Sequence, residues 1–399
     1  LPPMNIPKII LKHGKDVPVR RFHPWVFSGA IHGVQGSPAD GDVVEVCDRS
    51  GNLLGTGHFH HGSIAVRLLT FEQADLFDIV FWEEKLHGAL SVRQVAGLAD
   101  APDTDCFRLV HGEGDGLSGL VVDVYGPAAV VQCHSIGMHR QRALIAQALQ
   151  QVFGKKLDLV FDKSREALPP KYAEPVQNGY LLGSGSGGQV VSENGVQFRV
   201  DWETGQKTGF FLDQRDNRRL IAQFARDKSV LNTFGYTGGF SCYALRAGAR
   251  TVHSVDISGR AMELLEENIS LNAPFPGSHE GITEDVLRFL NNGGQAYEVV
   301  VVDPPAYAKS MDKRHNAVQG YKRLNEAALR RVAPGGILFT FSCSQVVDRD
   351  LFYHTIAAAA MEVGRPVRVL HHLTQGADHP VSMFHPEGAY LKGLVLHVE

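Results

Sequence analysis

The stretch that most constrains this chain covers residues 230–256 and reads VLNTFGYTGGFSCYALRAGARTVHSVD. A short apolar run at 230–231 leads into a glycine-rich turn, and a segment of helical character follows at 240–247. A second apolar run then ends in an acid, Asp256. Strand, loop, helix and strand in this order form the repeating unit of a parallel α/β sheet.

The spacing within this unit indicates a nucleoside-binding site. Gly235 precedes Asp256 by the roughly 20 residues expected between a nucleotide-cradling loop and the carboxylate that accepts ribose hydroxyls. The glycines do not follow the G-x-G-x-x-G pattern, so a dinucleotide with its pyrophosphate is disfavoured. A ligand with a ribose but no phosphate, such as S-adenosylmethionine, fits this turn better. The alternative is an ordinary α/β crossover with a glycine-rich bend.

Length and composition predict a soluble globular protein of two or three domains, since the 399 residues are 44% hydrophobic and 21% charged. Without a membrane-length apolar run or a signal-peptide pattern, we expect a cytoplasmic protein with no membrane partner and a natural start at Met4. The five cysteines are far apart and predict neither disulfides nor a zinc knuckle. His58, His60 and His61 lack a Cys or Asp at ligand spacing, so no metal site is expected.

Charge gives little indication of a nucleic-acid partner, because the net charge is −4. Residues 1–70 are the basic part, with seven Lys and Arg against five Asp and Glu. Phosphate contact would explain this bias, although a solvated surface is the simpler explanation.

The order of strand and helix patterns divides the chain into regions. Short strands between glycine turns over residues 9–70 predict a small β-barrel, and residues 107–161 predict an α+β region. The run GSGSGG at 183–188 precedes a hairpin centred on Asn194-Gly195, which places the last boundary near 185–190. Strands and helices then alternate as in a doubly wound α/β sheet. Helices are expected at 71–95, 138–153, 217–226 and 321–332.

Acidic side chains follow several strands of the expected C-terminal sheet, where ligands of doubly wound sheets bind. Asp256 suits two ribose hydroxyls, and Asp285 suits an adenine amino group. Asp303 follows the run VVVV and precedes two prolines, which remove amide hydrogens and fix the turn. Such a turn can present an acid to a planar substrate, or it can simply end a strand. The polar segment 205–215 can fold over the same crevice.

Cys343 follows the apolar run ILFTFS. A lone cysteine in such a strand is usually a small buried residue. Because the neighbouring strand is expected to end in Asp303, a thiol and a carboxylate should share one pocket. Covalent catalysis requires this arrangement of a nucleophile with an acid partner.

Motifs along almost the whole chain resemble those of the bacterial large-subunit ribosomal RNA cytosine-C5 methyltransferase I family. The matching stretches are RRFHPWVFSGAI, RLVHGEGDGLSGLVVDVYG, GQKTGFFLDQRDNR, NTFGYTGGF, VDPPAY, GGILFTFSCS and ADHP…PEGAYLKG. The resemblance implies a PUA domain near 6–72 and a central β-β-α-β-β domain near 75–185. It also implies a Rossmann-like class I methyltransferase domain at 190–399. Both smaller domains would help bind ribosomal RNA, and a homodimer is a further expectation.

The same resemblance implies the roles of individual residues. Cys343 would be the nucleophile that adds to cytosine C6, and Asp303 would hold the N3/N4 edge of the base while C5 takes the methyl group. The product would be 5-methylcytosine in large-subunit (23S) ribosomal RNA. The residues implied to hold or border S-adenosylmethionine are Phe210, Asp213, Gln214, Arg215, Asn232, Phe234, Gly235, Tyr236, Gly238, Asp256, Ile257, Asp285, Asp303 and Pro304.

Two departures from related sequences leave alternatives open. Many RNA cytosine-C5 methyltransferases carry a second cysteine that helps release product, and here that place is Ala306. Better-known family members have Lys-Phe where this chain has Ala306-Tyr307, although Lys309 could supply the charge. Methylation of another base atom, such as a guanine nitrogen, would need no thiol. A non-catalytic RNA-binding assembly factor is the alternative outside enzymes.

Overall fold

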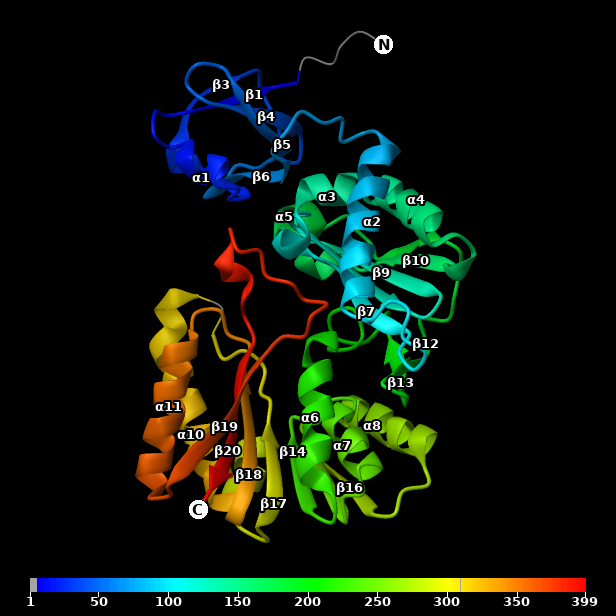
Figure 1. Ribbon diagram of the computed structural model, residues 1–399, viewed down its shortest axis with the longest axis vertical. Coiled ribbons are helices and arrows are strands. Elements are labelled where there is room, and N and C mark those ends of the chain that lie inside the picture. The colour runs from blue at the N-terminus through cyan, green and yellow to red at the C-terminus, as the bar shows by residue number, and fades with distance from the viewer. Residues whose placement is uncertain (1–5, 309) are drawn as a thin grey trace. The chain divides into compact units, whose positions relative to one another are not determined.

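The computed structural model describes residues 6–308 and 310–399, so the expected start at Met4 and the side chain of Lys309 lie outside the described residues (Figure 1). The chain divides into two compact units. The first contains the described residues up to Val191, together with Val200–Phe210 and Ala377–Gly388. The second contains Ser192–Arg199, Phe211–Gly376 and Ala389–Glu399.

The N-terminal part of the first unit is a six-stranded sheet in the order β2-β6-β5-β4-β1-β3. Its strands are β1 Lys8–Leu11, β2 Trp25–Phe27, β3 Ile31–Gln35, β4 Val43–Cys47, β5 Leu53–Phe59 and β6 Ile64–Thr70. In β1 the buried Ile9 and Leu11 alternate with less buried residues. Ile9, Leu11, Val44 and Val66 belong to the hydrophobic core of this sheet. Their burial is the main contribution to the stability of this part.

The rest of the first unit is built on a five-stranded sheet in the order β11-β10-β9-β8-β7. The strands are β7 Cys106–His111, β8 Leu120–Tyr125, β9 Ala128–Cys133, β10 Leu159–Asp162 and β11 Gly179–Leu182. Every residue of β9 is buried, as in a central strand covered on both faces.

Two helix predictions for this region need correction. α2 spans Ile79–Val95 rather than beginning at residue 71, because the Asp78 side chain caps its start by accepting a hydrogen bond from Val80 N at 3.0 Å. The helix expected at 138–153 is two helices, α3 Ile136–Arg140 and α4 Arg142–Phe153. Gln141 separates them, and its side-chain amide donates to Leu76 O at 3.0 Å.

β12 Gly188–Glu193 and β13 Val196–Asp201 form a hairpin. Its tip, Ser192–Arg199, belongs to the second unit, whereas the start of β12 and the end of β13 belong to the first. Its turn residues Asn194 and Gly195 have φ values of 48° and 72°. Positive φ at both central residues is what a two-residue hairpin turn of the expected Asn-Gly type requires.

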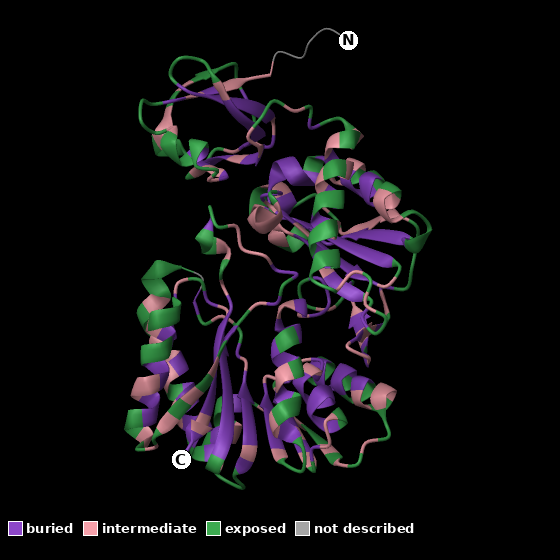
Figure 2. Ribbon diagram, viewed as in Figure 1, coloured by how far each residue is buried: buried purple, intermediate pink, exposed green. Residues whose placement is uncertain are grey.

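The second unit is a seven-stranded sheet in the order β16-β15-β14-β17-β18-β20-β19. Neighbours from β16 to β18 are parallel, whereas β20 is antiparallel to both β18 and β19. The strands are β14 Ser229–Thr233, β15 Thr251–Asp256, β16 Ser278–Thr283, β17 Tyr297–Val302, β18 Val332–Ser342, β19 Val367–Thr374 and β20 Lys392–Val398. Its central strands are the most continuously buried part of this unit (Figure 2).

Helices cover this sheet as a doubly wound fold requires. They are α6 Arg215–Ala225, α7 Gly239–Arg246, α8 Gly259–Asn272, α9 Val286–Asn291, α10 Arg314–Arg331 and α11 Arg349–Val363. α9, α10 and α11 share one hydrophobic core with Val300 and Val302 of β17. The helix expected at 321–332 spans Arg314–Arg331. Its early start was missed because the first two turns are mostly polar and bury only Ala317, so they show no apolar period. α6 likewise begins two residues before its expected start. Within the described residues, no helix is long and apolar enough to cross a membrane.

The strand order reverses between β14 and β17: β15 and β16 lie on the side of β14, and β18, β20 and β19 lie on the side of β17. At such a switch point the loops after the two strands diverge and leave a crevice at the carboxyl ends. The glycine turn after β14 and Asp303 after β17 therefore lie at the same edge of the sheet.

A buried ion pair joins the hairpin tip to α6. Both oxygens of Glu193 accept hydrogen bonds from Arg218, Nε to Oε1 at 2.9 Å and Nη2 to Oε2 at 2.7 Å. Tyr243 OH also donates to Glu193 Oε1 at 3.0 Å. Removing one partner of such a pair leaves a buried charge without compensation.

Glu193→Gln should therefore lower the free energy of unfolding by about 3–5 kcal/mol, measured by urea denaturation. The matched control is Glu263→Gln, which breaks an exposed pair with Arg260 and should cost less than about 1 kcal/mol. Equal losses in the two variants would contradict a stabilising role for the buried pair.

Candidate active site

The turn after β14 has an uncommon backbone conformation. Phe234, Tyr236 and Gly238 have φ values of 56°, 44° and 81°. For residues with a bulky side chain this region costs roughly 1–3 kcal/mol, so the surrounding structure must hold the turn in place. A Cβ at Gly238 would lie 2.7 Å from Leu265 Cγ, so a side chain there would also clash. Strained loops of this kind are concentrated at ligand sites.

Asp256, at the end of β15, holds this turn through backbone amides. Its Oδ2 accepts a hydrogen bond from Tyr236 N at 3.0 Å, and its Oδ1 accepts one from Ser258 N at 2.9 Å. Each carboxylate oxygen has two acceptor positions. Asp256 can therefore fix the loop and still accept hydrogen bonds from two ribose hydroxyls.

Other expected cofactor residues occupy different environments. Asn232 is buried and donates from Nδ2 to Ser241 Oγ at 2.8 Å, which links β14 to α7. Ile257 is exposed. Asp285 is also exposed, and it caps α9 by accepting a hydrogen bond from Arg288 N at 2.8 Å.

The segment before α6 contributes a carboxylate with a free acceptor. Asp213 Oδ2 accepts a hydrogen bond from Tyr390 OH at 2.7 Å. Asp213 Oδ1 is buried and has no hydrogen-bond partner among the described residues. An unsatisfied buried acceptor is costly, so it points to a donor that a ligand supplies.

The remaining residues of this segment differ in their surroundings. The Phe211 ring packs edge-on against Tyr236, with centroids 5.1 Å apart. Arg215 is buried, and its Nε lies 3.5 Å from Glu193 Oε2. Phe210 is buried in the first unit, so its expected contact with the cofactor stays a prediction.

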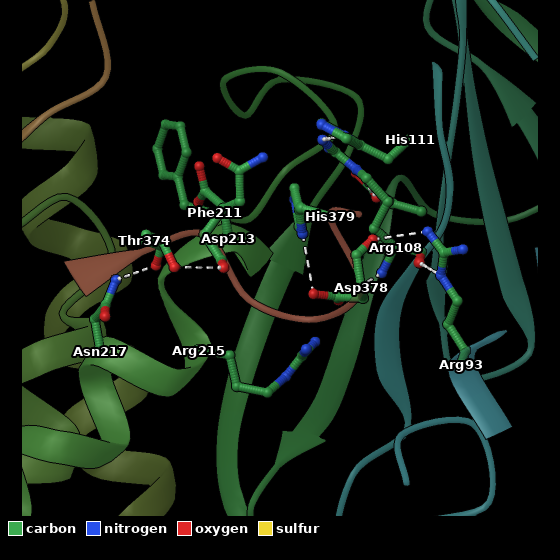
Figure 3. A network of polar contacts seen from close by, with 12 residues as sticks. Arg93, Arg108, His111, Phe211, Asp213, Arg215, Asn217, Thr374, Asp378 and His379 are labelled. Atoms are coloured by element: carbon green, nitrogen blue, oxygen red, sulfur yellow. Dashed lines mark hydrogen bonds and ion pairs between the residues drawn. The ribbon is translucent and has the colours of Figure 1, made fainter. Parts of the chain in front are cut away.

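Gln214 is oriented toward Asp303 by Asn217. Asn217 Nδ2 donates to Gln214 Oε1 at 2.7 Å and to Thr374 O at 3.1 Å, and Figure 3 shows the second of these bonds. The Gln214 side chain also forms a hydrogen bond with Asp303. Because the Gln214 oxygen already accepts from Asn217, its amide nitrogen is the donor to Asp303. Asn217 was not identified from the sequence as a site residue.

Asp303 has an unusual acidity for a carboxyl group. Burial and the negative charge of Asp213 raise its pKa to about 7, although the hydrogen bond from Gln214 and the positive charge of Arg218 oppose the shift. Burial disfavours the charged carboxylate, and a neighbouring carboxylate does the same. At neutral pH, Asp303 can therefore either donate or accept a proton.

Cys343 directly follows β18, which is the parallel neighbour of β17. Burial and the charges of Asp303 and Asp213 raise the pKa of the thiol to about 11, and the charge of Lys392 opposes that shift. The structure thus brings Cys343 and Asp303 within electrostatic reach of each other, as expected.

Lys392 is the residue of this site whose role the sequence did not indicate. Its position opposite Ser342 in the β18–β20 register places it beside Cys343. Its Nζ donates to Ser344 O and Val347 O, each at 2.6 Å, so the ammonium group is fixed on the chain that follows Cys343. Burial lowers the pKa of Lys392 to about 8, which the nearby thiol partly offsets. Only the antiparallel strand register reveals this proximity.

The donor set of the site fits S-adenosylmethionine. The ammonium group and the two ribose hydroxyls of this ligand donate hydrogen bonds to carboxylate acceptors, and the charge of its sulfonium group is favoured by nearby carboxylates. The open acceptor of Asp213 and the carboxylate of Asp256 offer such acceptors. A seven-stranded sheet with this strand order and one antiparallel strand, a glycine turn after its first strand and an acid after its second together define a class I S-adenosylmethionine-dependent methyltransferase.

Comparison with known proteins agrees with this class. A family of S-adenosylmethionine-dependent methyltransferases matches residues 165–380, and a PUA-like domain family matches residues 9–71. The ribosomal RNA large subunit methyltransferase I of Klebsiella pneumoniae (strain 342) is 37% identical over 98% of both chains. That of Alteromonas mediterranea is 38% identical, again over 98% of both chains.

These relatives show that the chain belongs to the ribosomal RNA large subunit methyltransferase I family. The fold is shared with SMU.776, a candidate methyltransferase solved in complex with SAH. The two structures superpose with a TM-score of 0.82 at 20% sequence identity. The match covers 98% of this chain and 99% of the SMU.776 chain. The predicted multidomain α/β fold, with a class I methyltransferase sheet preceded by a PUA-like domain, is confirmed.

Two variants should shift the acidity of Cys343 in opposite directions. Asp303→Asn removes a negative charge that disfavours the thiolate, so the pKa of Cys343 should fall. Lys392→Met removes a positive charge that favours the thiolate, so the pKa should rise. Both comparisons are made between about pH 7 and about pH 8, where the Asp303 carboxyl group is ionised and the lysine is charged. The rate of iodoacetamide alkylation against pH measures both shifts. The other four cysteines are buried, so the readout is specific for Cys343.

Lys322→Met, which removes a lysine on α10 that pairs with Glu326 and Glu362, is the control and should leave the alkylation profile unchanged. Shifts of Asp303→Asn and Lys392→Met in the same direction would contradict the electrostatic description of this site.

Proposed function

We propose that the chain methylates C5 of a cytosine in large-subunit (23S) ribosomal RNA, with S-adenosylmethionine as the methyl donor. The observation that supports this most strongly is the position of Asp303 and Cys343 after neighbouring parallel strands, within electrostatic reach of each other. Methylation of a base nitrogen needs no such thiol. The names of the relatives indicate the RNA substrate.

The two residues divide the chemistry between them. Cytosine C5 is a weak nucleophile, so the Cys343 thiolate first bonds to C6 while the neutral carboxyl of Asp303 gives its proton to N3. The other carboxyl oxygen of Asp303 accepts a hydrogen bond from N4. This addition makes C5 an enamine carbon that can attack an electrophilic methyl group. Afterwards N3 returns its proton to Asp303, a base removes the C5 proton, and the thiolate leaves.

The acidity of Asp303 suits its step, whereas the Cys343 thiol, with a pKa of about 11, must be ionised before it attacks. A general acid works best when its pKa lies near the working pH, and Asp303 meets this condition with a pKa of about 7. Protonated Asp303 also carries no negative charge, which favours the thiolate of Cys343. Lys392 favours the thiolate further. Because Ala306 offers no second thiol, removal of the C5 proton must use another group or water.

S-adenosylmethionine supplies the electrophilic methyl group when it is bound. We assign the ribose hydroxyls to Asp256, the adenine amino group to Asp285 and the ammonium group to the open oxygen of Asp213. Phe234, Gly235, Tyr236 and Gly238 would form the wall beneath the nucleoside. The further residues of this proposed pocket are Phe210, Gln214, Arg215, Asn232, Ile257 and Pro304.

The three regions of the chain are assigned different functions in this proposal. We propose that residues 6–72 and 75–185 bind ribosomal RNA and that residues 190–399 hold the cofactor and the reacting base. A cytoplasmic location and a homodimer are parts of the same proposal. The PUA-like domain match at residues 9–71 supports the RNA-binding role of the first region.

Cys343→Ala tests the nucleophile directly. Transfer of labelled methyl groups to ribosomal RNA should fall by about 10³-fold or more, because the attacking atom is gone. Equilibrium binding of S-adenosylmethionine should stay within a few-fold of that of the unaltered protein. Base-resolution mapping of ribosomal RNA from cells that lack the protein should show one missing 5-methylcytosine.

Cys47→Ala, at a buried cysteine of the first unit, is the matched control and should keep its activity. Normal turnover by Cys343→Ala would contradict the covalent route and would favour methylation of another base atom. No label transfer by the unaltered protein to any ribosomal RNA would favour an RNA-binding assembly role instead.

A further inference from the structure

His385 is a buried histidine with unsatisfied ring nitrogens. It lies in the segment Ala377–Gly388 of the first unit and is only 3% exposed. Neither Nδ1 nor Nε2 has a hydrogen-bond partner among the described residues. Buried polar atoms are nearly always paired, so two open nitrogens on one ring require an explanation.

Two further ligand-type side chains lie beside it. One nitrogen of His23, one nitrogen of His385 and one carboxylate oxygen of Glu387 all lie within 4.8 Å of one another. Within this group, His385 Nε2 is 3.8 Å from Glu387 Oε2, and the His23 and His385 rings are 5.6 Å apart between centroids. This is the only such group that the described part of the chain contains.

The backbone holds both halves of this group in place. The segment Ala377–Gly388 is anchored at its start, where Asp378 O accepts a hydrogen bond from Arg93 at 2.7 Å and Asp378 Oδ2 accepts one from Arg108 N at 3.0 Å (Figure 3). At its end, His385 N donates to Ser382 O at 3.0 Å. His23 follows Phe22, whose φ of 64° is unusual for a bulky residue.

The hydrogen bonding of His23 suits a metal ligand. Its Nδ1 lies 3.3 Å from Trp25 O and 3.2 Å from Trp25 N. In the tautomer that donates from Nδ1 to Trp25 O, the lone pair of Nε2 is free to bind a metal ion. Metal-bound histidines usually donate their second nitrogen to a carbonyl or carboxylate in this way.

Negative charge nearby favours a cation at this place. Glu387 is exposed enough to rotate, with 57% of its side chain accessible. The half-buried carboxylate of Glu113 interacts electrostatically with His385, and it accepts a hydrogen bond from Trp25 Nε1 at 2.9 Å. The Trp25 ring in turn packs against His385, with centroids 4.3 Å apart.

We propose that His23, His385 and Glu387 form a binding site for a divalent transition-metal ion of the zinc type. Two imidazole nitrogens and one carboxylate oxygen are ligands that zinc accepts, with a water molecule in the fourth position. Ligand atoms around a tetrahedral zinc ion lie roughly 3.3 Å apart, given bonds of about 2.0–2.1 Å. Rotation of Glu387 and a small movement of the two rings would bring the atoms to that separation. The ion would fix the segment Ala377–Gly388 to the N-terminal sheet within the first unit.

The test uses the full chain, stripped of metal with EDTA and titrated with Co²⁺ and then Zn²⁺. One equivalent of Co²⁺ should bind, with visible absorption bands of a four-coordinate site, and Zn²⁺ should displace it. Glu387→Gln should weaken Co²⁺ binding at least ~10-fold, since it replaces a charged ligand with a poor one. Because Glu387 is exposed, this variant should keep its fold, which circular dichroism checks. His385→Ala should abolish binding.

Two controls locate the ion. His61→Ala removes an exposed histidine that pairs with Asp40 and should leave Co²⁺ affinity unchanged. Co²⁺ should also quench tryptophan fluorescence, and Trp25→Phe should remove this quenching without preventing binding. Absence of stoichiometric Co²⁺ binding would overturn the proposal, as would unchanged affinity in folded Glu387→Gln or loss of binding in His61→Ala.

Discussion

The parallel pairing of β17 with β18 is the constraint on which the chemistry of this protein depends. Both strands run in the same direction, so the residues that follow them emerge at the same edge of the sheet. A carboxyl group from one and a thiol from the other therefore meet there. The switch point between β14 and β17 adds the glycine turn at that edge. Cofactor pocket and reacting groups are thus a consequence of strand order rather than of any single motif.

The electrostatics of this edge couple its acid to its thiol. Low solvation raises the pKa of both Asp303 and Cys343, and each negative charge disfavours the other. Protonation of the carboxyl group and ionisation of the thiol therefore support each other. The fixed ammonium group of Lys392 favours the thiolate further. The placement of Asp303, Cys343 and Lys392 at one edge of the sheet therefore favours a reaction that needs a neutral carboxyl group and a thiolate at the same time.

The sequence predicted the parts of this site that depend on local pattern. Glycine spacing, apolar runs and the acids after them identified the turn, Asp256 and Asp303, and the alternation of strands and helices identified the doubly wound sheet. Helix starts were less predictable, because α2 begins at a capping residue and α10 begins with polar turns that show no apolar period.

Contacts between distant segments could not be predicted in the same way. Lys392 reaches Cys343 only through the antiparallel insertion of β20, and Asn217 orients Gln214 only through the folding of α6. The histidines at positions 58, 60 and 61 were considered as metal ligands because they are close in the sequence. The group with ligand geometry joins His23 to His385, near opposite ends of the chain. Such proximity is a property of the fold.

The covalent adduct at Cys343 is the central claim, and trapping it tests that claim most directly. Ribosomal RNA that contains 5-fluorocytidine lacks the C5 proton, so the thiolate cannot leave after methyl transfer. With S-adenosylmethionine present, the account predicts a complex that survives denaturation, with the modified nucleotide attached to the peptide that carries Cys343. An RNA that is methylated at a cytosine or any other base, without a trapped complex, would contradict it.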